Sequence, residues 1–174
     1  MDLQTPLQYK IWADRRTLDA VARLDQRSAS AAFAFARQQL NHMVRVEELF
    51  RARLIGAADP YASTNTHDVP QLTALDHRLM ASNRWLQDYV RTLPPGEIGK
   101  YIRFAFVDGR NGMLTREEVI YHLINHGTYH RGAIGHALDL AGAHRPADTY
   151  TVFVHAAEPA RRDAGPATDH RSSD

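Results

Sequence analysis

The sequence predicts an all-α fold, a four-helix bundle with a short β segment or hairpin between the third and fourth helices. Four long segments carry apolar residues at helical spacing, and two of the connections between them are long. Four helices joined by one or two long crossovers form a recognised bundle architecture. A length of 174 residues suits one domain. We assign the bundle to residues 1–156 and predict that residues 157–174, which lack large apolar side chains, form a disordered C-terminal tail.

The first two helices are predicted from their apolar residues. The first runs from about Leu3 to about Leu24, with one apolar stripe: Leu7, Ile11, Leu18 and Val21. The second runs from about Ala31 to about Ile55 and is apolar on two sides, as expected of a central helix. One side holds Phe33, Ala36, Leu40, Val44 and Leu54, and the other holds Phe35, His42, Val46 and Leu49.

The third and fourth helices also have recognisable ends. Leucines at heptad-like spacing predict a helix from about Leu72 to about Leu93, which Pro94-Pro95-Gly96 terminates. The fourth helix opens with a capping box, in which Thr115 and Glu118 each satisfy a free amide of the first turn. It continues to about Ala141, and Gly142 stands where a left-handed C-terminal cap is expected.

The connections differ in character. Residues 57–71 form a polar crossover. Within residues 99–112, apolar and other residues alternate around Ile102, Phe104 and Phe106 before the turn sequence DGRNG, which predicts a strand or hairpin. Residues 148–155 are apolar, and we expect them to pack back on the bundle.

The composition excludes several classes of chemistry and of partner. The chain has no cysteine, which excludes disulfides, thiolate metal sites and a cysteine nucleophile, and it has ten histidines. Its 21 basic and 20 acidic residues argue against a nucleic-acid-binding surface. No apolar run is long enough for a membrane span, and the N-terminus lacks the features of a signal peptide, so we expect a cytoplasmic protein with no membrane partner.

Three histidines recur at helical spacing in the fourth helix: His122, His126 and His130. With Val119 at 0° and about 100° per residue, His126 falls near −20° and His130 near +20°. That position is the middle of the stripe predicted to face the core, and His122 falls at its edge. Burying two unpaired imidazoles costs roughly 1–3 kcal/mol each, whereas a divalent cation between them turns the cost into a gain.

Two ligands rarely hold a metal, so a third is expected from another helix, and His42 on the second helix is the candidate. Structural packing remains the alternative interpretation for all three histidines. His122 fits a packing role better than a ligand role. Asn125 and Arg131 flank the pair and either contact substrate, orient an imidazole, or form ordinary surface contacts. The remaining histidines are given no role: His67, His77, His136, His144, His155 and His170.

The sequence resembles the DinB family of the DinB/YfiT-like superfamily, the DNA-damage-inducible family and not the DNA polymerase of the same name. The resemblance covers about residues 3–155 and rests on YKIWADRRTLDAV, LNHMVRVEELFRARL and NHGTYHRGAIGHAL. It implies an up-down-down-up bundle and a homodimer. It also implies a divalent metal, nickel or zinc, held by His42, His126 and His130, with water at the open positions. Where the family commonly has glutamine this chain has Ala133, which puts substrate contacts in doubt but not metal binding.

Two functions are compatible with this pattern. The first is a metal-dependent enzyme that activates a low-molecular-weight thiol cosubstrate or water against a small electrophilic substrate, as an S-transferase or hydrolase. The alternative is a non-catalytic metal-binding stress-response protein in which the ion stabilises the bundle. DNA binding is suggested only by the family name, and the balanced charge argues against it.

Overall fold

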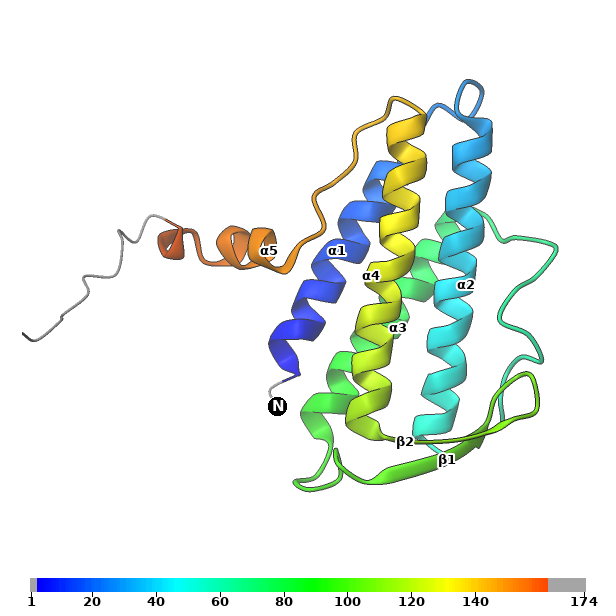
Figure 1. The fold of residues 1–174 in the computed structure, drawn as a ribbon, viewed down its shortest axis with the longest axis vertical. Helices are drawn as coiled ribbons and strands as arrows, with labels where there is room; N and C mark the ends of the chain where they lie inside the picture. Colours follow the sequence, from blue (N-terminus) through cyan, green and yellow to red (C-terminus); the bar gives the residue numbers. More distant parts are fainter. Residues whose placement is uncertain (1–2, 163–174) are drawn as a thin grey trace, which may run out of the picture.

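The computed structural model describes residues 3–162, which contain five α-helices and one β-hairpin (Figure 1). The four long helices are Gln4–Ala22 (α1), Ser30–Leu54 (α2), Leu72–Thr92 (α3) and Arg116–Leu140 (α4). They lie side by side, as expected of a helical bundle (Figure 1). The hairpin strands are Tyr101–Ala105 (β1) and Asn111–Thr115 (β2), and a short helix, Tyr150–Ala157 (α5), follows α4. The predicted helices and the hairpin are therefore confirmed.

Two apolar clusters fill the interior, and each of the four long helices contributes to both. One cluster includes Leu18, Leu40, Leu79 and Ile134. The other includes Leu7, Phe50, Leu86 and Leu123. Along each of the four long helices, the stretch between these two sets carries a buried polar or charged residue. We call these residues the polar layer: Lys10, Asp14, Glu47, Asn83 and Arg131.

The polar layer joins all four long helices through charge-assisted contacts. The Nζ atom of Lys10 lies 2.7 Å from Asp14 Oδ2, 2.7 Å from Glu47 Oε1 and 2.6 Å from Asn83 Oδ1. Arg131 donates from Nη1 to Asp14 Oδ1 at 2.8 Å. Both Lys10 and Asp14 are completely buried. Burial disfavours the ionised form of Asp14, but Lys10 and Arg131 outweigh it and hold the pKa of this carboxyl below its usual value.

Arg131 also extends the layer to the segment that follows α4. Its Nε atom donates to Asp148 Oδ2 at 2.8 Å, and Asp148 in turn accepts a hydrogen bond from the hydroxyl of Tyr9. Gly127 makes room for this arrangement, because a Cβ atom there would lie 2.8 Å from Nη1 of Arg131. The glycine of the α4 motif is thus explained by the close approach of a buried guanidinium to the helix.

The polar crossover between α2 and α3 is held along α2. Side chains about one helical turn apart on α2 bond to successive crossover residues: Arg53 to Asp59, Glu48 to Tyr61, Arg45 to the Ser63 carbonyl, Asn41 to Thr66, and Arg37 to the Val69 and Pro70 carbonyls. The crossover therefore follows α2 in spite of having no regular secondary structure. It passes beside the middle of α2, where His42 lies.

The hairpin leads directly into α4. Thr115 is both the last residue of β2 and the N-cap of α4. The predicted capping box is present: Glu118 donates its amide to Thr115 Oγ1 at 3.1 Å, and the Thr115 amide donates to Glu118 Oε2 at 2.7 Å. At the other end of α4, Gly142 has a φ of 67°, which fits the predicted left-handed cap.

The apolar segment after α4 packs back on α1, as predicted, and does so as α5. Phe153 is buried against Tyr9, Ala13 and Trp12. Of the predicted C-terminal tail, Ala157 ends α5, residues 159–161 form a 3₁₀ turn, and residues 163–174 lie outside the described residues. Among the described helices, none combines the length and apolar character needed to cross a bilayer.

Candidate metal centre

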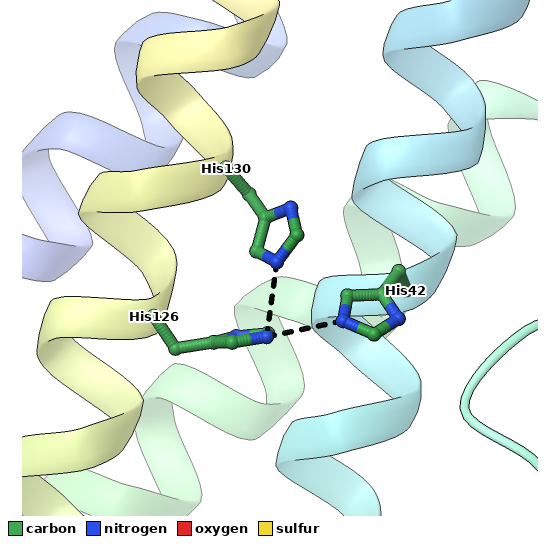
Figure 2. Close-up of side chains that lie close together, drawn as sticks. All are labelled: His42, His126 and His130. Atoms are coloured by element: carbon green, nitrogen blue, oxygen red, sulfur yellow. Dashed lines mark hydrogen bonds between the residues drawn. The ribbon is translucent and has the colours of Figure 1, made fainter.

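The structure brings together His42 of α2 and His126 and His130 of α4 (Figure 2). The Nε2 atom of His126 lies 3.1 Å from Nε2 of His42 and 3.0 Å from Nε2 of His130. One nitrogen from each ring lies within 4.8 Å of the other two. All three side chains are half-buried, so the cluster is neither sealed in the core nor fully exposed. These three are the histidines that the sequence singled out.

The position of the histidines on α4 corrects one prediction. The centre of the buried face of α4 is occupied by Ile120, Gly127, Arg131 and Leu138, about 100° around the helix from Val119. His126 and His130 lie at the edge of that face and point toward α2 (Figure 2). Val119 and Leu123 of the predicted stripe are buried, but the stripe is only one side of the buried face. The centre of that face was missed because an arginine and a glycine do not look like core residues in a sequence.

A glutamine one turn before His42 fixes the protonation of His130. The Oε1 atom of Gln39 lies 2.6 Å from Nδ1 of His130. A carboxamide oxygen can only accept a hydrogen bond, so Nδ1 carries the proton and Nε2 presents a lone pair to the cluster. Metal-binding histidines commonly have such a partner on the second ring nitrogen. Sequence reasoning missed Gln39, although its spacing of three residues from His42 places both on one side of α2.

The second ring nitrogen of His42, Nδ1, faces the crossover. This atom is buried and lacks a hydrogen bond of good geometry, although Thr64 and Asn65 of the crossover are close enough to affect the ring. Burial lowers the pKa of His42, and the contacts with Thr64 and Asn65 act in the opposite direction. The crossover thereby forms one wall of the cluster.

The cluster favours neutral imidazoles. Burial, followed by the proximity of His130 and His42, lowers the pKa of His126 to about 3. Burial, followed by the proximity of His42, lowers the pKa of His130 to about 4. Near neutral pH these rings therefore carry no charge, and each has one nitrogen with a free lone pair. A neutral imidazole with a free lone pair is the form that binds a metal ion.

The spacing of the nitrogens fits a single divalent ion. Two imidazole nitrogens, each at about 2.0–2.1 Å from a tetrahedral ion, lie about 3.3 Å apart. The observed separations of 3.0 and 3.1 Å come close to that value. The three-histidine cluster could therefore bind a divalent metal.

The other candidate residues lie elsewhere. Arg131 is buried in the polar layer and bonded to Asp14, Asp148 and Thr128, so a buried network takes the place of the surface contacts that were one alternative for this residue. Asn125 is exposed on α4. His122 lies one turn before His126, with ring centroids 5.4 Å apart. It lies outside the group of three converging nitrogens.

Replacing Gln39 with leucine should weaken zinc binding by about 10- to 100-fold, because the proton of His130 loses the acceptor that holds it on Nδ1. Gln39→Glu, which keeps an acceptor oxygen, should retain most of the affinity. Affinities would be measured by competition with a chromogenic chelator. Gln38→Leu, on the neighbouring position of α2, is the matched control, and an equal loss in both leucine variants would contradict the role of Gln39.

The metal-free protein should lose stability as the pH falls from about 6.5 toward 4. Below 6.5 the unfolded chain binds protons at His126 and His130, whereas the folded chain binds them only near pH 3 and 4. The contribution of these two histidines to the free energy of unfolding is thus present above pH 6.5 and is lost on acidification. Urea unfolding at pH 7.5 and pH 5 measures the change. His126→Gln should lose less between these two values than the wild type, and an equal or larger loss would contradict the shifted pKa.

Comparison with known proteins identifies a family. The model of the DinB family matches residues 1–164 of the 174-residue chain. No curated protein matches the sequence, and no solved structure matches it. The family match includes all five α-helices, the hairpin and the three-histidine cluster. The chain therefore belongs to the DinB family.

Proposed function

We propose that this protein is a metal-dependent enzyme that uses a thiol cosubstrate or water to attack a small electrophilic substrate, in an S-transferase or hydrolase reaction. The observation that carries the proposal is the convergence of three neutral imidazole nitrogens from His42, His126 and His130. A divalent ion bound there, with open coordination positions, would lower the pKa of water or a thiol and polarise a carbonyl group.

The residues of the chain would prepare the site for that ion. Gln39 holds the proton of His130 on Nδ1 and so directs the Nε2 lone pair to the centre. The crossover closes the side of His42 with Thr64 and Asn65. The half-buried histidines leave the centre accessible, as a reactant requires. Since the chain has no cysteine, a thiol in the reaction must come from a separate molecule.

The second candidate, a metal-binding stress-response protein without catalysis, is favoured by one observation. The three histidines come from α2 and α4, so an ion would link two helices (Figure 2). Ligand binding stabilises a fold in proportion to the logarithm of ligand concentration over the dissociation constant. Large stabilisation by zinc without turnover of any electrophile would favour this function over the enzyme.

Other properties of the protein remain proposals. We propose nickel or zinc as the ion, because imidazole ligands suit both. Family membership supports a homodimer and an up-down-down-up order of the four long helices, and the crossover that follows α2 supports that order. A cytoplasmic location and the absence of a nucleic-acid partner remain predictions from composition.

The test is a comparison of metal-free, zinc-loaded and nickel-loaded protein with two reagents. With 2-mercaptoethanol and 1-chloro-2,4-dinitrobenzene, a carbon–sulfur bond forms, chloride leaves and the thiol proton passes to the buffer. With 4-nitrophenyl acetate, water cleaves the ester. Metal-dependent turnover that is lost in His126→Gln would support the proposal. Equal rates for metal-loaded wild type and His126→Gln in both assays would overturn it for these reaction types.

A further inference from the structure

A cavity of about 190 Å³ lies beside the histidine cluster. It is partly open to solvent and is lined by α2, α4, the crossover and the turn of the hairpin. His122 and His126 form its α4 side, and Thr64 forms its crossover side. Because Nε2 of His126 also contacts His42 and His130, the His126 ring belongs to both the cluster and the cavity.

The α2 side of the cavity is apolar. Apart from Arg53, it consists of Val46, Leu49 and Phe50, each of which is buried in the fold. The Phe50 ring also packs against the ring of His122, with centroids 5.2 Å apart. A charged or strongly polar group placed against this wall would lose its hydration without gaining a partner. The wall therefore selects for an apolar occupant.

The cationic residue in the lining does not alter this preference. Arg53 donates from Nε to Asp59 Oδ1 at 3.2 Å and from Nη2 to Asp59 Oδ2 at 2.8 Å. Its guanidinium carbon also lies 5.1 Å from the Phe50 ring centroid and 4.9 Å from that of Phe104. Because its charge is paired with a carboxylate of the crossover, Arg53 is not available to bind an anion.

The hairpin turn supplies the remaining wall with two large apolar side chains that are partly exposed. Phe106 is 41% exposed and Val107 is 42% exposed, although both border the cavity. Gly112 of β2 leaves space for this arrangement, since a Cβ atom there would lie 2.7 Å from the Phe106 ring and 2.8 Å from the Phe104 ring. An apolar ligand in the cavity would cover part of this surface and gain from its burial.

We propose that the cavity binds an uncharged aromatic or branched alkyl group, about one six-membered ring in size, that the electrophilic substrate places beside His126. A protein cavity of about 150 Å³ lined by leucine, isoleucine and phenylalanine binds benzene, so the volume here suits one ring. The assignment of this group to a substrate rests on the proposed function. The binding preference of the cavity itself does not.

The experiment uses metal-free protein and two fluorinated probes followed by ¹⁹F NMR. Fluorobenzene should bind saturably, and 4-fluorobenzoate, which has the same ring with a negative charge, should bind at least tenfold more weakly. Fluorobenzene should also shift the ring resonances of His126, identified by their absence in His126→Gln. Equal binding of the two probes, or a fluorobenzene complex with no effect on His126, would overturn the proposal.

Two variants locate the binding site. Val107→Asp places a carboxylate at the partly exposed rim and should weaken fluorobenzene binding at least tenfold. Leu140→Asp places the same charge in another apolar hollow, at the far end of α4, and should leave binding unchanged. Loss of binding in Leu140→Asp with none in Val107→Asp would overturn the assignment. Circular dichroism confirms that both variants are folded.

This design separates the two proposals. Fluorobenzene binding is measured without metal and without turnover, so it tests the cavity alone. Binding of fluorobenzene together with an absence of metal-dependent turnover would support the cavity and count against the enzyme. Turnover without fluorobenzene binding would support the enzyme and overturn the cavity.

Discussion

A His126→Gln variant should lose zinc that the wild type retains in a ratio of one ion per chain. Nε2 of His126 is the atom that contacts both of the other histidines. Its removal leaves only the nitrogens of His42 and His130 to bind the ion. Loss of a residue that only supports a ligand already costs about 10- to 100-fold in affinity, and loss of the ligand itself should cost more. Metal content after dialysis, measured by mass spectrometry, gives the result.

The matched control for this change is His136→Gln. His136 is an exposed histidine on the same helix and is not part of the cluster. This variant should bind zinc as the wild type does. If both variants retain one ion per chain, the cluster is not the metal site.

An Arg131→Met variant should be destabilised by about 3–5 kcal/mol, because it removes one partner from a buried ionic network. The change leaves Asp14 inside the bundle with Lys10 as its remaining cationic partner, and it leaves Asp148 without its guanidinium. Arg131 and Asp14 have no exposed side-chain surface, so water cannot replace the lost contacts. Urea unfolding of the metal-free protein at pH 7.5 measures the loss.

Arg91→Met is the control for the loss of an ion pair at the surface. Arg91 and Asp88 are both about two-thirds exposed, and such pairs contribute about 1 kcal/mol or less. Gly127→Ala offers a second test, because its Cβ atom would displace the guanidinium of Arg131 without removing any charge. Losses of similar size in Arg131→Met and Arg91→Met would contradict a stabilising role for the polar layer.

The helices were predictable because their signals are local. Apolar spacing identified α1 and α3, and the pair Thr115 and Glu118 fixed the start of α4. The hairpin followed from alternation and a turn sequence. These features depend on residues within a few positions of one another, and the physical preference acts in the isolated segment. The spacing of His126 and His130 is also a local signal, because the two residues lie about one turn apart on the same helix.

What the sequence did not reveal depends on pairing between distant segments. From the sequence alone, Arg131 is expected at the surface, because the sequence does not show that Asp14, 117 positions earlier, faces it. The same is true of Gln39, whose partner His130 is 91 positions away. A charged side chain can be buried only where a residue of opposite charge pairs with it, here from another helix. The apolar periodicity of one helix contains no information about the residues of another. This explains why the centre of the buried face of α4 was predicted near Val119 and the histidines, and not near Gly127 and Arg131.

The junction between β2 and α4 restricts how a molecule could enter the cavity. Thr115 ends the strand and caps the helix, so no residue between them is free to act as a hinge. The first turn of α4 is also tied to the other end of the hairpin, since the amide of Arg116 donates to the Lys100 carbonyl at 3.2 Å. Motion of the whole hairpin away from α4 would break these bonds. Exchange of a ligand is therefore expected through rotation of the side chains of Phe106 and Val107, on the fast timescale of exposed rotamers.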